Sequence, residues 1–544
     1  MLKQLKISHF YTNWLPTLII IVLILGVFFR FVNLDKKVYW TDEVASSIRI
    51  SGYNFEEVKQ LGLRGEEIGV QDLQKYQYPN PEKGLGDILK GLAAEEPQLP
   101  PLYFISARFW VQLFGNSVAV TRSFSAVVSL LAFPCIYWLC QELFASALVG
   151  WVAMALIAVS PLHVLYAQES RFYSLWTVTI LLSSAALLRA MRLQTKSSWI
   201  MYAASLALGF YTFLLTGLVA VGHGIYVVAS ESFRFRKTVK AYLLASVAGV
   251  LFFLPWIVTV LSNYSSADGA TSWTKDKVHL PALVRTWILN LSRIFFDFNE
   301  NFESKYLLLY ILMIVLVVYS IYYLYRQAQK QTWLFIFTLI GVTALTLALP
   351  DLIVGGRRSS VIRYLIPSFL GIQLAIAYLL ATKITAISLK IWQQKFWQVA
   401  TAVLLSIGVV SCAISSQADT WWNKYKQIHN PAVAKIINQT EKPLVIMPGY
   451  ELLALSHVLD PQVRLQSPAL RQVKTPTGEI GSIVELNPLG KNFSHVFVYN
   501  IENALQDVLK KQPNLKIEKT YYWKRQSEPV YTTQTTLWKL SKKG

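Results

Sequence analysis

The chain has 544 residues, of which 54% are hydrophobic and 15% are charged, with a formal net charge of +20. Soluble proteins average about 25% charged residues, and here long apolar runs alternate with short polar links, so the composition indicates a polytopic membrane protein. The excess of Lys and Arg gathers in the links, as in cytoplasmic loops of membrane proteins. No nucleic-acid-recognition motif accompanies the charge, which argues against a nucleic-acid partner. The three cysteines lie in or at the ends of apolar runs and predict neither a disulfide framework nor a zinc site.

Apolar runs predict about twelve helices in or across a membrane. The first, residues 14–32, is long enough to cross a bilayer at a rise of about 1.5 Å per residue. It lacks a small-residue cleavage site, so we expect a retained span rather than a removed signal peptide. Several later runs are short enough to be tilted or broken helices. They lie near residues 101–115, 118–140, 147–161, 172–188, 199–214, 216–230, 241–261, 306–325, 332–350, 361–382 and 396–416.

The basic links predict the side of the membrane on which each loop lies. With these links in the cytoplasm, residues 262–305, residues 350–361 and everything after 416 fall outside. Residues 162–171 then also fall outside, although counting forward from a cytoplasmic N-terminus places them inside. The conflict leaves two explanations open, a broken helix pair around Pro161 or a miscounted short helix at 101–115. The basic links are residues 189–197, 231–240, 326–330 and 383–395.

Two polar regions stand apart from the apolar runs. Residues 34–99 predict a first outer loop, in which residues 54–61 and 86–94 suit amphipathic helices on the membrane surface. Residues 262–305 predict a second large outer loop. From residue 417 the pattern predicts a soluble α/β domain, so we divide the chain into 1–416 and 417–544. Within the soluble domain we expect strands at 444–449 and 495–499, and helices at 449–459 and 502–511.

Two adjacent carboxylates, Asp42 and Glu43, follow the first span and stand beside Tyr39 and Trp40. Aromatic rings suit the headgroup zone of a membrane, and a carboxylate there can meet both a lipid-borne and a water-borne substrate. A solvated juxtamembrane loop is an equal explanation. Because neighbouring side chains point in different directions, the two carboxylates are expected to have different roles.

Polar residues inside an apolar stretch form a second candidate site. Residues 160–175 contain Gln168, Glu169, Arg171 and Tyr173, and charged or amide groups at membrane depth are costly and usually functional. If this stretch is helical, Gln168 and Arg171 share one face, while Glu169 and Tyr173 share the neighbouring face. Two interpretations stay open: a brace from Arg171 to Glu169 or Gln168 between helices, or a polar cavity in which Arg171 faces a phosphate or carboxylate.

Three arginines, Arg357, Arg358 and Arg363, lie at the predicted outer end of a span, where the positive-inside bias disfavours them. Arginine recognises phosphate in a planar, bidentate manner, although attraction to anionic lipid headgroups explains the cluster equally well. The sequence has no His/Asp/Glu group with metal-ligand spacing, no nucleophile elbow and no phosphate-binding loop, so it gives no support to an ATP-driven mechanism.

Taken in chain order, these motifs resemble the GT-C glycosyltransferases of family 39. That group includes protein O-mannosyltransferases and the bacterial aminoarabinose transferases that act on lipid A. The resemblance covers residues 10–380. Many relatives carry His or Lys directly before the proline pair, where this chain has Leu99, so a contact made there must come from Gln98 or be absent. The matching motifs are Asp42-Glu43, Pro100-Pro101-Leu102-Tyr103, Arg122, Ser160-Pro161, residues 168–175 and residues 363–367.

The resemblance implies an α-helical polytopic membrane protein of the GT-C type, with about 11–13 transmembrane helices and a small extracytoplasmic α/β domain at the C-terminus. It implies a bacterial-type plasma membrane with the N-terminus in the cytoplasm. The partners would be the bilayer, a polyprenyl-phosphate sugar donor and an acceptor hydroxyl on a protein, a lipid or a glycan. No cofactor is expected, and a requirement for a divalent cation stays open.

The implied reaction is the inverting transfer of a hexose or pentose to that hydroxyl. Asp42 is the predicted base, and Glu43 either orients it or contacts the donor. Besides a base for the acceptor hydroxyl, such a transfer needs cationic groups that stabilise the leaving phosphate. The residues predicted to bind the donor phosphate or sugar are Tyr103, Arg122, Gln168, Glu169, Arg171, Tyr173, Arg357, Arg358, Arg363 and Tyr364.

Two other functions compete with this prediction. A transporter or flippase of lipid-linked glycans would also have many spans and intramembrane arginines, but it would not need a long outer loop led by a carboxylate pair. A polysaccharide polymerase or ligase would also transfer sugars, with a large central outer loop rather than a large first one.

Overall fold

The structure is a computed structural model that describes residues 14–63, 65–447, 449–474, 480–485, 493–500, 515–528 and 531–542. The chain forms two compact units, each assembled from three stretches of sequence. The first, here called the helical unit, comprises Met1–Leu34, Glu96–Tyr103 and Arg122–Gln417. The second, here called the sheet unit, comprises Asp35–Glu95, Phe104–Thr121 and Ala418–Gly544.

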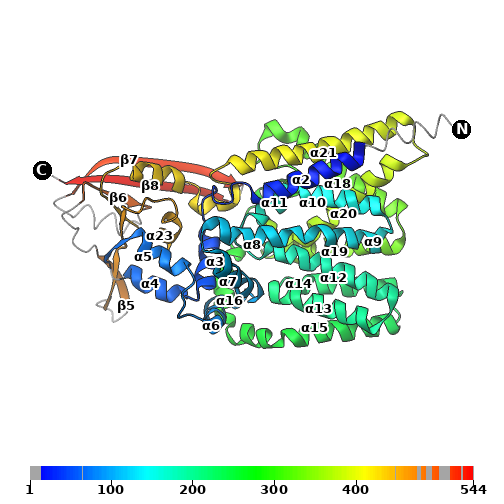
Figure 1. Ribbon diagram of the computed structural model, residues 1–544, viewed down its shortest axis with the longest axis horizontal. Coiled ribbons are helices and arrows are strands. Elements are labelled where there is room, and N and C mark those ends of the chain that lie inside the picture. Colours follow the sequence, from blue (N-terminus) through cyan, green and yellow to red (C-terminus); the bar gives the residue numbers. More distant parts are fainter. Residues whose placement is uncertain are drawn as a thin grey trace. The chain divides into compact units, whose positions relative to one another are not determined.

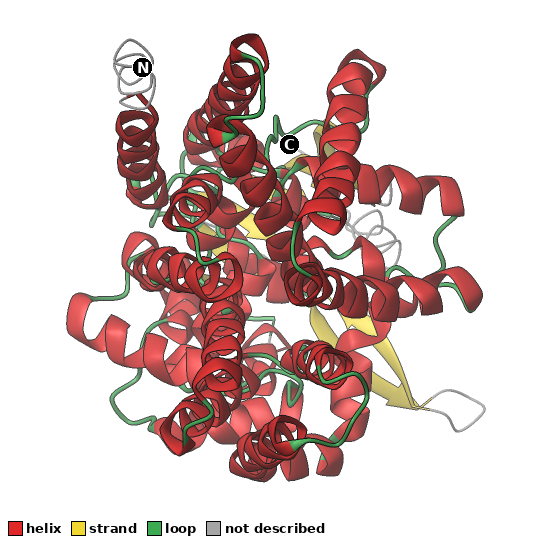
Figure 2. Cartoon of the chain, turned by 90° about the vertical axis from the view of Figure 1, so that its right-hand side faces the viewer, coloured by secondary structure: helices red, strands yellow, loops and turns green. Residues whose placement is uncertain are grey.

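Long helices that run alongside one another make up the helical unit (Figure 1), and many of them are seen nearly end-on in Figure 2. Short 3₁₀ segments connect some of them: η2 (Ser272–Lys275), η3 (Ser304–Tyr306), η4 (Arg358–Ser360) and η5 (Ile362–Leu365). The helices are α2 (Trp14–Phe31), α8 (Val118–Leu130, which begins in the sheet unit), α9 (Ala132–Phe144), α10 (Ala147–Ala158), α11 (Pro161–Ala167), α12 (Tyr173–Leu193), α13 (Lys196–Thr212), α14 (Thr216–Ser230), α15 (Lys237–Ser262), α16 (Tyr264–Thr271), α17 (Leu280–Ser292), α18 (Leu307–Gln327), α19 (Lys330–Ile353), α20 (Ile366–Thr385) and α21 (Ile391–Gln417).

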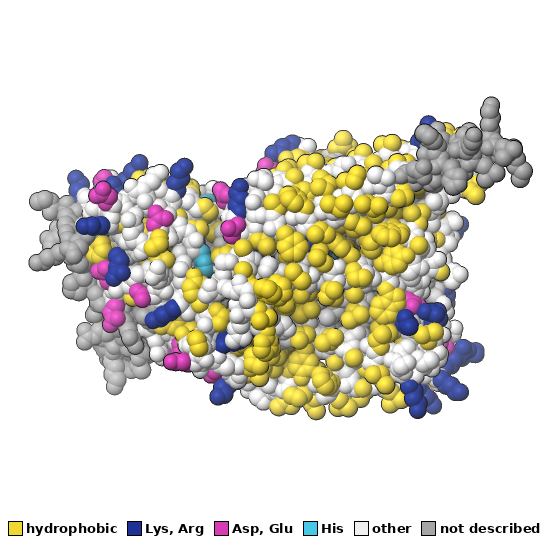
Figure 3. Space-filling view, viewed as in Figure 1, with side chains coloured by type: hydrophobic (Ala, Val, Ile, Leu, Met, Phe, Trp, Pro, Cys, Tyr) yellow, Lys and Arg dark blue, Asp and Glu magenta, His cyan; other side chains and the backbone are white. Residues whose placement is uncertain are grey.

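Among the described residues, eight helices are long and apolar enough to cross a membrane, or nine if the bent pair α10–α11 counts as one span. Figure 3 shows hydrophobic side chains over most of the visible face of this unit, and α15 exposes large ones such as Leu244 and Phe252. Exposed apolar surface of this extent is suited to lipid. The predicted polytopic membrane class is confirmed. The expected total of 11–13 spans counted shorter helices, such as α13 and α14, which fall below the 18 residues of a full span.

The helix expected near 147–161 is broken, and α10 and α11 meet at an angle of 61°. Pro161 is the first residue of α11, a position where its missing N–H costs nothing, whereas inside a continuous helix it would clash with the preceding turn. The structure shows the broken pair around Pro161. The helix expected at 101–115 is α7 (Leu102–Phe114), whose 13 residues are also too few for a full span.

The carbonyl groups at the end of α10 are satisfied by other helices. The buried guanidinium of Arg30, on α2, donates to Ile157 O at 3.1 Å and to Ala158 O at 2.7 Å. A Cβ atom added to Gly26 of α2 would lie 2.6 Å from Ala158 O, and one added to Gly408 of α21 would lie 2.7 Å from Val159 O. The break therefore depends on two glycines that allow close approach and on one arginine that fills hydrogen bonds lost at a helix end.

The sheet unit combines short helices with β-strands. The predicted amphipathic helices correspond to α4 and α6, the predicted strands to β2 and β6, and the predicted helix at 449–459 to α23; the predicted helix at 502–511 lies outside the described residues. The elements are α3 (Thr41–Ser51), α4 (Phe55–Leu63), β1 (Glu67–Gly69), α5 (Val70–Gln74), η1 (Lys75–Gln77), α6 (Leu85–Glu95), α7 (Leu102–Phe114, which begins in the helical unit), η6 (Trp422–Gln427), α22 (Asn430–Asn438), β2 (Pro443–Ile446), α23 (Gly449–Leu455), β3 (Arg464–Gln466), β4 (Ala469–Lys474), β5 (Ile480–Glu485), β6 (His495–Tyr499), β7 (Leu515–Glu528) and β8 (Tyr531–Lys542).

The described strands form a six-stranded sheet in the order β1-β3-β2-β6-β8-β7 and a separate two-stranded pair, β4-β5. In the larger sheet β2 is parallel to β3 and β6, while the other neighbours are antiparallel. The edge strand β1 comes from the first polar loop and pairs Glu67 with Gln466. An ion pair of 2.8 Å between Arg464 Nε and Glu67 Oε1 supports the same pairing.

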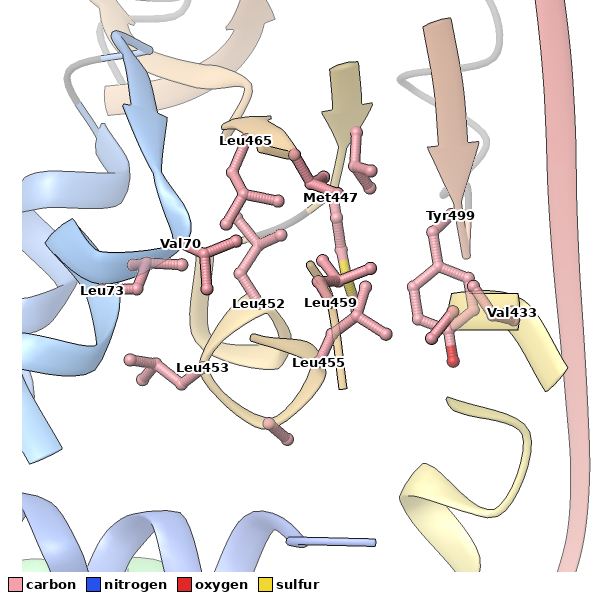
Figure 4. Packing of buried hydrophobic residues seen from close by; sticks show 14 of the residues in the cluster. Val70, Leu73, Val433, Met447, Leu452, Leu453, Leu455, Leu459, Leu465 and Tyr499 are labelled. Atoms are coloured by element: carbon pink, nitrogen blue, oxygen red, sulfur yellow. The ribbon is translucent and has the colours of Figure 1, made fainter. Parts of the chain in front are cut away.

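One hydrophobic core joins the first polar loop to the C-terminal region. Figure 4 shows Val70 and Leu73 of α5 facing Leu452 and Leu453 of α23, with Leu465 of β3 nearby. Because these loop residues bury their side chains against the C-terminal elements, residues 35–95 fold with residues 418–544. The sequence pattern instead divides the chain at residue 416 and assigns the loop to the membrane domain, since a local pattern carries no information on long-range packing.

Candidate active site

The two adjacent carboxylates lie in the first turn of α3. The carbonyl of Trp40 accepts hydrogen bonds from the backbone N–H groups of Glu43 and Val44 at 2.9 and 3.0 Å, which starts the helix. Acidic side chains are favourable in this first turn, where the helix dipole is positive. The helix ends at Gly52, whose φ of 87° is the left-handed conformation that glycine adopts most readily.

Asp42 and Glu43 have different surroundings. Asp42 is half-buried, whereas the side chain of Glu43 is completely buried and forms an ion pair of 2.8 Å with the Nζ of Lys424. Lys424 is itself only 1% exposed and lies 5.6 Å from the centre of the Trp40 ring. Glu43 is thus engaged by the C-terminal region of the chain.

Two further hydrogen bonds connect the start of α3 to the same C-terminal segment. The N–H of Val38 donates to Asp419 O at 2.8 Å, and the N–H of Thr41 donates to Gln427 Oε1 at 3.1 Å. Sequence reasoning missed Lys424 and Gln427. One signal in the sequence pointed to Lys424. It stands between the aromatic residues Trp422 and Tyr425, and a lysine buried among such residues needs a charged partner.

The second candidate site is a turn rather than the expected helix. Residues 168–172 are non-helical between α11 and α12, so the expected sharing of helix faces does not occur. The Nε2 of Gln168 donates to Phe29 O at 2.7 Å and to Val32 O at 2.9 Å, both at the end of α2. Gln168 therefore anchors the turn to α2.

Tyr103 fixes the other side of this turn. Its hydroxyl lies 2.9 Å from Ser125 Oγ and 3.5 Å from Ser170 Oγ, and Ser125 Oγ donates to Arg171 O at 3.1 Å. Glu169, within the turn, is 1% exposed. These contacts indicate that Tyr103 shapes the backbone that presents Arg171.

Two arginines that are far apart in sequence converge on one aromatic ring. The guanidinium carbon of Arg171 lies 6.0 Å, and that of Arg363 5.7 Å, from the centre of the Tyr173 ring. Arg363 also lies 5.8 Å from the ring of Trp273, in η2, and 5.8 Å from that of Tyr364. Cationic groups are attracted to aromatic faces, so these rings are favourable neighbours for the guanidinium groups.

The remaining predicted arginines fall into two kinds. Arg357 lies 5.9 Å from the Trp273 ring and so belongs with Arg363. Arg358 instead forms an ion pair of 3.1 Å with Asp351, whose other carboxylate oxygen accepts from the N–H and the hydroxyl of Ser359, each at 2.7 Å. This arrangement indicates a structural role for Arg358 in closing the loop after α19.

Two other predicted residues pack within the helical unit. Arg122, 1% exposed, donates from Nη1 to Leu34 O at 2.6 Å. Tyr364 is half-buried, and its ring lies 5.9 Å from that of Phe213. As for metals, no group of three or more His, Cys, Asp or Glu side chains that could hold an ion occurs in the described part of the chain.

Known proteins resemble this chain both in sequence and in fold. Residues 98–258 match the family model of dolichyl-phosphate-mannose-protein mannosyltransferases. The fold is similar to the crystal structure of ArnT from Cupriavidus metallidurans bound to undecaprenyl phosphate, with a TM-score of 0.51, and to the apo state of the same protein, with a TM-score of 0.52. Each alignment covers 97% of this chain and 98% of ArnT at 12% sequence identity. No curated protein sequence matches at a significant level.

The fold defines a polytopic membrane protein that is similar to ArnT in its architecture. More narrowly, the predicted resemblance is confirmed: the chain is similar to protein mannosyltransferases over residues 98–258 and to ArnT in its fold.

Proposed function

We propose that this protein transfers a sugar, with inversion, from a polyprenyl-phosphate-linked donor to a hydroxyl acceptor at the outer face of the membrane. Membrane glycosyl transfer in general is supported by the family match and by the ArnT-like fold. A polyprenyl-phosphate donor is supported by the undecaprenyl phosphate bound to ArnT in its crystal structure. The N-terminus would then be cytoplasmic.

The observation that carries the proposal is the convergence of Arg171 and Arg363 on Tyr173. Tyr173 thus brings cationic groups from two distant segments into one neighbourhood. Planar guanidinium groups recognise phosphate in a bidentate manner, so this neighbourhood suits the phosphate of the donor. Arg357, which shares the Trp273 ring with Arg363, would extend the same site.

In the proposed reaction Asp42 takes the proton from the acceptor hydroxyl while the acceptor oxygen forms a bond to the anomeric carbon. The bond from that carbon to the phosphate oxygen breaks, and its electron pair leaves with the polyprenyl phosphate. The arginines stabilise the charge that develops on this leaving group. Attack from the face opposite the leaving group inverts the anomeric configuration. We expect neither a nucleotide nor a cofactor to be needed, and a parallel assay in EDTA would test for a divalent cation.

Asp42→Asn tests this assignment in proteoliposomes supplied with undecaprenyl phosphate mannose or undecaprenyl phosphate aminoarabinose. Removal of a general base is expected to lower turnover by about 100-fold to 10,000-fold without changing expression or thermal unfolding. Asp35→Asn is a matched control, because Asp35 is an exposed carboxylate in the same segment. Near-normal turnover of the Asp42 variant would refute the role of Asp42 as the base.

The sugar and the acceptor require a separate experiment. Mass spectrometry of cell-envelope glycans, lipids and proteins would compare cells with the gene, cells without it, and cells carrying the Asp42→Asn variant. We expect one sugar modification to disappear in both of the altered strains. An unchanged envelope, together with accumulation of a lipid-linked glycan on one side of the membrane, would favour a transporter instead.

A further inference from the structure

We propose that Lys424 is a positioning residue for the transfer reaction, which holds Glu43 so that the neighbouring Asp42 is presented as the base. This inference rests on the proposed function and adds to it a role for the C-terminal region. Glu43 and Lys424 lie 381 positions apart in the sequence, and their charged atoms are 2.8 Å apart in a fully buried site.

A buried ion pair is a poor device for stability alone. Removing both charges from water costs about as much as their attraction returns, and apolar residues of similar size often replace such a pair without loss. What an ion pair provides is a defined geometry, because the carboxylate and the ammonium group must meet at one distance and in one direction. The place of the pair, directly beside the proposed base, makes geometry the relevant property.

The segment that carries Lys424 also fixes the backbone of the carboxylate motif. Residues 419–427, here called the clamp, accept hydrogen bonds from the N–H groups of Val38 and Thr41. Lys424 adds the ion pair to Glu43 and the contact with the Trp40 ring. The clamp thus contacts residues before and after Asp42, through backbone hydrogen bonds as well as through side chains.

Loss of Lys424 would act on the position of Asp42. A buried carboxylate that loses its cation is destabilised, so Glu43 would shift from its place in the buried pair. Because Glu43 stands next to Asp42 in the first turn of α3, such a shift would displace Asp42 as well.

The test uses full-length protein in proteoliposomes with the undecaprenyl-phosphate sugar that the wild type consumes. Lys424→Met is expected to lower kcat at least 30-fold with less than a 3-fold change in the KM for the donor. Lys424→Arg, which keeps the charge, is expected to retain more activity than Lys424→Met. Lys426→Met is the matched control, since Lys426 is an exposed lysine of the same clamp, and its turnover is expected to equal that of the wild type.

The double variant Glu43→Gln with Lys424→Met distinguishes positioning from direct participation, and it remains informative if Lys424→Met alone unfolds. Both partners become neutral in the double variant, and the ion pair is already lost in each single variant, so we expect the kcat of the double variant to lie within about 3-fold of that of Lys424→Met. A double variant whose loss of kcat is the product of the two single losses would overturn the proposal, as would normal kcat in Lys424→Met. If the wild type itself transfers no sugar, the proposed function fails; if Asp42→Asn is inactive while Lys424→Met is normal, only the present inference fails.

Discussion

At the scale of single residues, charged side chains that look equivalent in the sequence differ in the residues that surround them. Arg358 and Arg363 are five positions apart, and both were predicted to bind the donor. Arg358 is paired with Asp351, which is completely buried, whereas Arg363 lies among the rings of Tyr173, Trp273 and Tyr364. The first arrangement stabilises a loop, and the second is the one on which the proposed phosphate site rests.

We therefore predict opposite effects for the two substitutions. Arg363→Ala is expected to weaken donor binding by about 10- to 100-fold, since a hydrogen bond to a charged group contributes about 1.5–3 kcal/mol. Arg358→Ala is expected to leave donor binding within about 2-fold and to lower the free energy of unfolding by about 1–3 kcal/mol, because it leaves a buried carboxylate without its cation. Binding of a fluorescent polyprenyl-phosphate analogue and thermal unfolding in detergent would measure the two quantities.

Arg293→Ala provides an additional control for the effect of net charge. Arg293 is a buried arginine whose Nη1 donates to Asn290 Oδ1 at 3.1 Å. It directly follows α17, within residues 262–305. If Arg293→Ala and Arg363→Ala reduce donor affinity equally, the arginines act only through their net charge, and the proposed phosphate site is incorrect.

We expect the stability of the sheet unit to depend on pH because of His429. Burial lowers the pKa of this imidazole below its ordinary value of 6.5, and the nearby Arg525 lowers it further. Below pH 6.5 the unfolded chain binds a proton that the folded protein does not, so the free energy of unfolding falls by about 1.4 kcal/mol per pH unit until the folded pKa is reached. Limited proteolysis and tryptophan fluorescence at pH 7.5 and 5.5 would follow this change.

The matched variant for that experiment is His429→Gln, which removes the titrating group. Its sheet unit should lose less stability between pH 7.5 and 5.5 than that of the wild type. The same loss in both proteins would show that another group controls the acid sensitivity.

At the scale of elements, the break between α10 and α11 is the feature on which the polar turn depends. The turn at 168–172 directly follows α11 and is anchored to α2 through Gln168. Helix α2 also supplies Arg30, which binds the carbonyls at the end of α10. The packing of α2 against this break therefore determines where the turn that carries Arg171 is held.

Gly26→Ala tests this packing. The added Cβ would lie 2.6 Å from a backbone oxygen, Ala158 O, so α2 must shift, and we expect a loss of stability of about 1–3 kcal/mol together with reduced turnover. Gly341→Ala in α19 is the matched control, because a Cβ there meets nothing within 4 Å. That substitution is expected to be neutral or to stabilise by up to about 1 kcal/mol. Thermal unfolding of both variants in the same detergent is the measurement, and equal melting temperatures would contradict the packing argument.

At the scale of the whole molecule, the first polar loop and the C-terminal region form one folding unit. Strand β1 of the loop is the edge strand next to β3, and loop residues such as Val44, Ile48 and Leu73 are buried in a core with C-terminal residues such as Leu453 and Phe497. The C-terminal region is consequently part of the scaffold that carries Asp42.

We predict that deletion of residues 418–544 leaves a protein that still inserts into the membrane but has lost the fold of residues 35–95. The loop would expose its share of the core and lose the partner of β1, so trypsin is expected to cleave it at least 10-fold faster than in the intact protein. Sugar transfer should be abolished. A truncated protein with a protected loop and measurable transfer would show that the C-terminal region is a dispensable addition.

The sequence by itself determined the membrane class, the positions of most helices, the strands β2 and β6, and the motifs that resemble GT-C glycosyltransferases. These features follow from the length, periodicity and composition of short windows, which local chemistry controls. Only the tertiary structure decided that residues 168–172 form a turn, that Arg358 pairs with Asp351, and that the first loop shares a core with the C-terminal region. It also revealed Lys424 as the partner of Glu43. Ion pairs and core packing depend on which distant residues come into contact once apolar surface is buried, and a local sequence pattern contains no information on those contacts.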